Sequence, residues 1–175
     1  SAGDTIGATP LLSALFHDEP AIEAFNDMGV DFNAVGNHEF DEGLTELLRM
    51  QRGGCHPVDG CQDGDGFDGA DFRYLGANVF HEGTNRTALP PFRIRTFNHG
   101  IKIAFIGLTL EATPTIVTPS GVAGLEFRDE ADTINRLVGQ LRGRGVENIV
   151  VLIHEGGFPA MGGLYNECPG VSGPI

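Results

Sequence analysis

The sequence lacks any apolar run that approaches the roughly 20 residues a membrane-spanning helix needs, which predicts a protein without a membrane partner. It is also poor in basic residues, because 11 Lys and Arg face 24 Asp and Glu for a net charge of −13. Without a Lys/Arg cluster to neutralise phosphates, a nucleic acid polymer is not expected as a bulk ligand. An anionic substrate stays compatible with this composition if bound metal cations supply the local positive charge.

Cysteine is scarce as well, with three residues in the whole chain. Cys55 and Cys61 flank a short stretch inside a Gly/Asp/Pro-rich loop, where a disulfide would stabilise a segment with almost no core of its own. The alternative is a pair of zinc ligands, although their spacing is wider than the usual two to four residues and no second pair follows. Cys168 is left over. The disulfide interpretation favours an extracellular or cell-envelope location.

Apolar periodicity divides the chain into alternating helices and strands, and its 175 residues are enough for one domain with a sizeable core. A turn with glycine at residues 98–100 predicts a hairpin between two of the strands. Asp18 and Asp129 are expected to cap the helices that follow them. The pattern predicts an α/β sandwich with mixed sheets. The expected helices span residues 10–16, 18–28, 42–52 and 130–142, and the expected strands span residues 30–35, 72–79, 92–97, 101–110 and 148–153.

The loop over residues 55–71 carries an acidic series whose spacing has a faint similarity to a calcium-binding loop. The bidentate glutamate and the ordered ligand frame of such a loop are absent. A solvated Asp/Gly loop held by the disulfide is therefore the favoured interpretation. The acidic series consists of Asp59, Asp63, Asp65, Asp68 and Asp71.

Polar residues follow three apolar segments at the points where strands are expected to end. Asp4 comes after the first such segment, Asn37-His38 after the second, and His154 after the last. In open α/β sheets, ligands bind at the carboxyl ends of the strands. We therefore expect these residues to meet at one edge of the sheet.

The residue types at this edge suit a dinuclear metal centre, which needs a carboxylate that can bridge two cations about 3.5–4 Å apart. Asp4 is the natural bridge, while Asn37 offers a carbonyl oxygen and His154 an imidazole nitrogen. Such ligands suit two divalent ions of the Zn, Mn, Co or Fe type. A metal-bound water there can lose a proton near neutral pH and attack phosphorus.

His38 follows the expected ligand Asn37 directly, so its ring is expected above the metals, where it could act as a general acid. Asp41 lies three residues further on and can accept a hydrogen bond from the other ring nitrogen. That bond would fix the tautomer and raise the pKa of His38.

Each of these residues also has a purely structural interpretation. Asp4 could cap a turn, Asn37 could stabilise a left-handed turn, and His154 could be a satisfied histidine at a strand end. Glu39 and Asp41 could cap the following helix. The remaining histidines lie in loops without partner spacing and are interpreted as structural; they are His17, His56, His81 and His99.

The ordered set Gly3-Asp4, Gly36-Asn37-His38-Glu39 and His154 resembles three consecutive motifs of the calcineurin-like metallophosphoesterases. The strings Gly3–Ala8 and Gly36–Asp41 are similar to the branch of 5′-nucleotidases and 2′,3′-cyclic-nucleotide phosphodiesterases. The resemblance implies an α/β/β/α sandwich and two divalent cations. It implies Asp4, Asn37 and His154 as metal ligands, and His38 with Asp41 as the catalytic dyad. The implied substrates are nucleotides or other small phosphoesters.

The resemblance also implies parts that these residues do not contain. The first motif of the family would precede Ser1, its last would follow Ile175, and a separate substrate-binding domain is missing. We therefore expect residues 1–175 to be the central part of a catalytic domain, incomplete at both ends and inactive alone. The alternatives are a truncated or degenerate domain that acts as a binding module, and a phosphate-binding loop at Gly3–Ala8, which lacks Lys and Arg.

Overall fold

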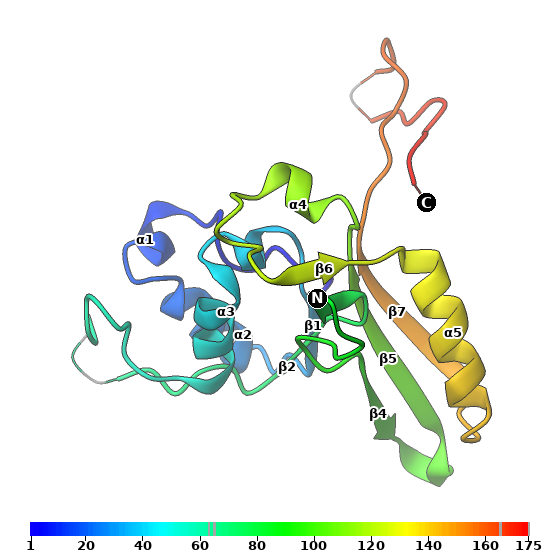
Figure 1. The fold of residues 1–175 in the computed structure, drawn as a ribbon, viewed down its shortest axis with the longest axis horizontal. Coiled ribbons are helices and arrows are strands. Elements are labelled where there is room, and N and C mark those ends of the chain that lie inside the picture. The colour runs from blue at the N-terminus through cyan, green and yellow to red at the C-terminus, as the bar shows by residue number, and fades with distance from the viewer. Residues whose placement is uncertain (63, 65, 165, 175) are drawn as a thin grey trace.

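The structure, a computed structural model, describes residues 1–62, 64, 66–164 and 166–174 and folds them as a mixed α/β protein (Figure 1). The α/β class predicted from the sequence is confirmed. The longer predicted helices are present with slightly different ends. The helical segments are α1 (Leu11–Ala14), α2 (Glu19–Asp27), α3 (Gly43–Arg52), α4 (Thr113–Ile116), α5 (Glu130–Arg142), and the single 3-10 turns η1 (His38–Phe40) and η2 (Asn98–Gly100).

The strands form three small sheets with both parallel and antiparallel pairs, so the predicted mixed sheets are confirmed. In the first sheet, β1 (Phe32–Ala34) runs parallel to β2 (Arg73–Leu75). In the second, β3 (Val79–His81) runs antiparallel to β6 (Leu125–Phe127). In the third, β4 (Phe92–Thr96) forms the predicted hairpin with β5 (Lys102–Thr109), and β7 (Asn148–His154) lies parallel to β5.

Two apolar clusters hold these elements together. The first gathers around the β1–β2 pair, α2 and α3, with Ile22, Leu47 and Tyr74 fully buried. The second lies between β5 and α5, where Leu137 and Leu141 project from the same helix face at the expected spacing of four residues. Figure 1 shows α5 beside β5 and β7, and α1 to α3 gathered at the other end of the molecule.

The helix α5 begins as the sequence predicts. The Asp129 carboxylate accepts a hydrogen bond from the amide of Asp132 at 2.7 Å, and this satisfies one free N–H of the first turn. The predicted acid at the cap of α2 and the proline in its first turn are confirmed, but the Asp18 side chain makes no capping bond. Asp18 occupies the N-cap position in a left-handed conformation (φ 61°) without a side-chain capping bond. Its carboxylate instead accepts hydrogen bonds from Gly7, Thr9 and Ser13.

The single strand predicted over residues 72–79 is also wrong, because the chain passes between two sheets there and forms β2 and β3. Gly76 lies so close to Leu89 that an added Cβ would be 3.1 Å from the leucine side chain. Asn78, which is fully buried, donates to the carbonyls of Thr109 and Arg128 and accepts from the Thr109 amide. A buried side-chain amide satisfied by backbone groups of other segments fixes this crossing.

Cys55 and Cys61 form the predicted disulfide, which removes the alternative of a cysteine zinc pair, and Cys168 is free and exposed. Asp63 and Asp65, two members of the acidic series, lie outside the described residues. Within the part of the chain that the structure describes, no helix is long and apolar enough to cross a membrane.

Candidate functional site

The Asp4 loop and the turn after β1 meet at two glycines. A Cβ added to Gly3, whose φ is +102°, would lie 2.4 Å from the Gly36 amide nitrogen. A Cβ added to Gly36 would lie 2.2 Å from Asp4 Oδ1. Any side chain at either position would force the two segments apart. The glycines of the two motifs therefore allow the Asp4 carboxylate to sit against the turn that carries His38.

The buried Glu39 side chain connects the segment around Asp4 with the turn after β1. Its buried carboxylate accepts hydrogen bonds from the amides of Asp4 at 2.9 Å, Thr5 at 2.7 Å and Gly36 at 2.5 Å. The Thr5 hydroxyl donates to the same carboxylate at 2.9 Å. Burial raises the pKa of Glu39, and these hydrogen bonds oppose that rise by stabilising the charged form. Glu39 is thus a brace between motifs, which the sequence pattern did not reveal.

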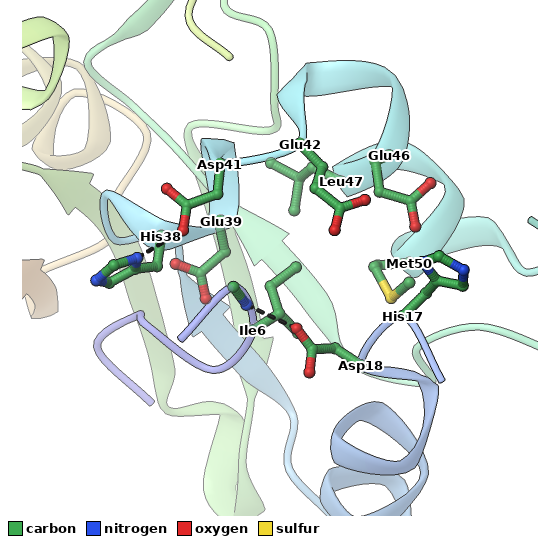
Figure 2. A pocket seen from close by; sticks show the side chains of 11 residues that line it. Ile6, His17, Asp18, His38, Glu39, Asp41, Glu42, Glu46, Leu47 and Met50 are labelled. Carbon is green, nitrogen blue, oxygen red and sulfur yellow. Dashed lines mark hydrogen bonds and ion pairs between the residues drawn. The ribbon is translucent and has the colours of Figure 1, made fainter. Parts of the chain in front are cut away.

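His38 and Asp41 lie on η1 and directly after it, so their spacing of three residues brings both side chains to one side of the turn (Figure 2). His38 Nδ1 is 2.7 Å from Asp41 Oδ2, and each side chain is about one-third exposed. The hydrogen bond with Asp41 raises the pKa of His38, partial desolvation lowers it, and the carboxylates of Asp41, Asp4 and Glu39 raise it further. The arrangement therefore favours an imidazolium at position 38.

His154, the last residue of β7, reaches the Asp4 loop from the far end of the chain. Its Nε2 lies 3.0 Å from Asp4 Oδ2, and its Nδ1 lies 2.9 Å from the Ala2 carbonyl oxygen. Because a carbonyl can only accept, Nδ1 must carry a proton. A neutral ring then points the bare lone pair of Nε2 at a carboxylate oxygen. A cation shared between His154 Nε2 and the Asp4 carboxylate, whether a proton or a metal ion, would remove the repulsion between these two acceptors.

Asn37 sits beside these groups with its side chain available to a ligand. It lines the same open pocket as His154, and its amide has no hydrogen-bond partner among the described residues. Its backbone is right-handed (φ −73°), so a left-handed turn does not explain the asparagine. The other Asp4 oxygen, Oδ1, accepts from the His38 amide at 3.0 Å. Asp4, Asn37, His38 and His154 therefore meet at one edge, on the carboxyl ends of β1 and β7.

The structural alternatives for the two acids are not observed either. The N-cap position of α3 is Glu42, which makes no side-chain capping bond. Glu39 and Asp41 instead make the contacts described above. The donor set of one carboxylate, one amide oxygen and one imidazole fits a borderline divalent cation.

The sequence pattern missed a second group of polar side chains. His17 and His56, interpreted as isolated structural histidines, stack with ring centroids 3.8 Å apart, and both lie beside Asp59. That interpretation is wrong about their isolation. His56 and Asp59 are three residues apart in the loop that the disulfide closes, whereas nothing in the sequence indicated that His17 joins them.

Comparison with known proteins gives relatives over nearly the full chain, although no family model matches it. The chain is 40% identical over 153 residues to a protein named endonuclease YhcR from Bacillus subtilis strain 168, covering 87% of the chain and 12% of YhcR. It is 29% identical over 174 residues to a 5′-nucleotidase from Vibrio cholerae, covering 99% of the chain and 27% of that protein. The chain thus spans well under two-thirds of these relatives.

Solved structures with a similar fold carry the same kinds of name as the sequence relatives. A 5′-nucleotidase precursor from Thermus thermophilus superimposes with a TM-score of 0.67 at 26% identity, covering 87% of this chain and 27% of that one. The calcineurin-like phosphoesterase YfkN from Bacillus subtilis superimposes with a TM-score of 0.65 at 24% identity, covering 89% and 47%. The relatives named 5′-nucleotidase, together with the shared fold of these structures, support the resemblance to the 5′-nucleotidase branch of the calcineurin-like metallophosphoesterases.

Proposed function

We propose that these residues supply the catalytic centre of a metal-dependent phosphoesterase that hydrolyses nucleotides or other small phosphoesters. The observation that carries the proposal is the approach of His154 Nε2 to Asp4 Oδ2 at 3.0 Å, with the amide of His38 on the other Asp4 oxygen. Three segments that are far apart in the sequence converge there. Metal-competent ligands and a proton donor then share one edge.

Asp4, Asn37 and His154 would hold the metal, with Asp4 placed to bridge two divalent ions of the Zn, Mn, Co or Fe type. When bound, such ions lower the pKa of a coordinated water and polarise a phosphoryl oxygen. The neutral His154 tautomer, fixed by the Ala2 carbonyl, presents Nε2 as the ligand atom. Glu39 holds the backbone of Asp4 and Gly36 in place beneath the ligands.

His38 would donate a proton to the leaving alkoxide and stabilise negative charge on the phosphoryl group. Asp41 keeps Nδ1 protonated and orients the ring, so Nε2 carries the transferable proton. The raised pKa of His38, caused first by its hydrogen bond with Asp41, favours this acid form. Its partial exposure leaves the ring accessible to a substrate that approaches from solvent.

The names of the relatives support a nucleotide substrate, because several are 5′-nucleotidases. The relative named an endonuclease favours a second candidate, the hydrolysis of phosphodiester bonds in nucleic acid. The net charge of −13 opposes that second candidate, because electrostatic attraction to a polyanion is missing. We therefore rank nucleotides first.

We also propose that residues 1–175 form the central part of the catalytic domain and turn over little substrate alone. A location outside the cytoplasm is supported by the disulfide and by a relative named cell wall protein Lmo0130 from Listeria monocytogenes.

The test is an assay of the longest natural polypeptide that contains these residues, beside the 175-residue chain. Metal content is measured, and hydrolysis of AMP, a 2′,3′-cyclic nucleotide and single-stranded DNA is followed with Mn²⁺ or Zn²⁺ added. We expect the full-length protein to hydrolyse AMP or the cyclic nucleotide. We expect this activity to be lost when a chelator is added and in the His154→Ala variant. A full-length protein that binds no divalent metal and stays inactive after metal addition would refute the proposal. Faster cleavage of DNA would favour the second candidate.

A further inference from the structure

We call Asp4, Asn37, His38 and His154 the strand-end site. A second cluster of metal-competent side chains is formed by other residues. His17 comes from the turn between α1 and α2, and His56 and Asp59 come from the loop closed by the disulfide. Each of the three offers a ligand atom within 4.8 Å of the others. We propose that His17, His56 and Asp59 bind a divalent cation of the zinc type, separate from the phosphoesterase centre.

Both imidazoles are directed at one carboxylate oxygen. Asp59 Oδ2 lies 3.0 Å from His17 Nε2 and 3.3 Å from His56 Nδ1. The two rings are nearly parallel, with an interplanar angle of 10°. Two stacked imidazolium ions would repel each other at this distance, so at least one ring is best accommodated in its neutral form. A neutral imidazole is the form that binds a metal.

The hydrogen bonding of His56 points the same way. The backbone amide of Asp59 donates to His56 Nδ1 at 3.2 Å, which requires that nitrogen to be bare. The same bare nitrogen then faces the Asp59 carboxylate, so an acceptor opposes an acceptor. A cation between the nitrogen and the oxygen would take this lone pair in place of the Asp59 amide and convert the repulsion into two favourable contacts.

The loop is organised before any ion arrives. The disulfide closes it, and the Gly60 amide donates to the His56 carbonyl at 2.9 Å. The side chains of His17 and His56 are only 19% and 14% exposed, whereas Asp59 is 46% exposed. The two largely buried imidazole side chains would hold the cation in a fixed position, and the more exposed Asp59 carboxylate leaves a path by which the cation can enter from solvent.

Neighbouring carboxylates add negative charge around this seat. Glu42 and Glu46 each offer an oxygen within 4.8 Å of a His56 ligand atom. Glu46 is already paired with Arg49 at 2.7 Å, which leaves Glu42 as the carboxylate closer to free. His17 and the His38–Asp41 pair line one pocket, and Figure 2 shows His17 near Met50 and Glu46 at the opposite end from that pair. The two sets of side chains share no residue, although both reach this pocket.

The donor set defines the class of ion. Two imidazole nitrogens with one carboxylate suit Zn²⁺ and its borderline neighbours, whereas Ca²⁺ and Mg²⁺ prefer oxygen ligands throughout. The bound ion would join the disulfide loop to the α1–α2 turn, and its remaining position would be filled by water or Glu42.

The test is Zn²⁺ titration by calorimetry of the protein carrying Asp4→Asn and His154→Ala, in which the strand-end site is disabled. We expect one equivalent to remain bound. Adding His17→Ala or Asp59→Asn should weaken that binding by more than about tenfold, since even outer-shell changes cost about 10–100-fold. His99→Ala, at an exposed turn, is the matched control and should leave the titration unchanged.

A second measurement needs no substitution within the cluster itself. Histidine side-chain ¹⁵N NMR of the Asp4→Asn, His154→Ala protein should show the His17 and His56 signals shifting together, complete at one equivalent of Zn²⁺. Absence of a bound equivalent would overturn the proposal. Shifts confined to other histidines, or binding unaffected by both His17→Ala and Asp59→Asn, would overturn it equally.

Discussion

The strand-end site and the His17–His56–Asp59 cluster use the same kinds of side chain but are held in place by different means. At the strand ends, Gly3, Gly36 and the buried Glu39 lock two backbone segments together, so the ligands inherit the rigidity of the sheet. In the cluster, a disulfide closes a loop that has little core of its own. Rigid placement of ligand side chains can therefore come from buried backbone hydrogen bonds or from a covalent link.

The largest expected effect separates the chemistry of the two regions. His38→Ala should lower kcat of the full-length enzyme by roughly 10²–10⁴, the scale typical of a general acid, while metal content stays unchanged. Steady-state kinetics and elemental analysis measure the two quantities. His99→Ala, at an exposed turn outside both sites, serves as the control and should leave kcat near the wild-type value. Loss of metal with His38→Ala would show that His38 is a ligand.

The brace beneath the strand-end site gives the next largest effect. Glu39→Ala leaves the amides of Asp4, Thr5 and Gly36 without their acceptor, so the free energy of unfolding should fall by roughly 2–4 kcal/mol. Urea unfolding of both proteins measures this change. Glu147→Ala, at an exposed position, is the control and should change stability by less than about 0.5 kcal/mol. Equal effects would mean that Glu39 is not a brace.

The covalent link in the loop should contribute less. Cys55→Ser with Cys61→Ser should lower the free energy of unfolding by about 2 kcal/mol, the loop-entropy value for so short a ring. The same change should weaken Zn²⁺ binding at the cluster and leave the strand-end site unaffected. Thiol titration of the denatured, unreduced wild type should find one thiol, Cys168. A titration that finds three thiols would show that Cys55 and Cys61 are not bonded to each other.

The smallest effect concerns the protonation of the dyad. In metal-free protein, NMR titration of His38 should give a pKa above the ordinary histidine value, and Asp41→Asn should lower it. Because the folded-state pKa is raised, the associated stability is full below the unfolded pKa of about 6.5 and is lost as the pH rises through the folded value. A titration of His38 unchanged by Asp41→Asn would contradict the pairing.

Local features of the fold were predictable where neighbouring residues decide them. The Asp129 cap, the hairpin at residues 98–100 and the apolar face of α5 depend on contacts within a few positions, and the structure confirms them. The strand predicted over residues 72–79 failed because its break depends on Asn78 meeting Thr109 and Arg128 from distant segments. The apolar composition of residues 72–79 does not indicate that the chain passes from one sheet to another there.

The candidate site divides in the same way. The pairing of His38 with Asp41 follows from three residues of spacing on one turn, and the sequence was enough to predict it. The sequence indicated Asp4 and His154 as candidate ligands, but it could not predict that Asp4 Oδ2 lies 3.0 Å from His154 Nε2. It offered only a helix cap as an alternative for Glu39 and left His17 and His56 apart, because the contacts of Glu39 with Thr5 and of His56 with His17 join distant segments.

The amino-acid order alone was enough for the longer helices and for short-range pairs such as His38 with Asp41, because local backbone geometry sets those. The packing of distant segments set which carboxylate faces His154 and which faces His17. Loop closure over tens of residues, the buried hydrogen bonds of Glu39 and the contact between Gly3 and Gly36 set those distances. They arise from packing between segments that the linear order does not relate.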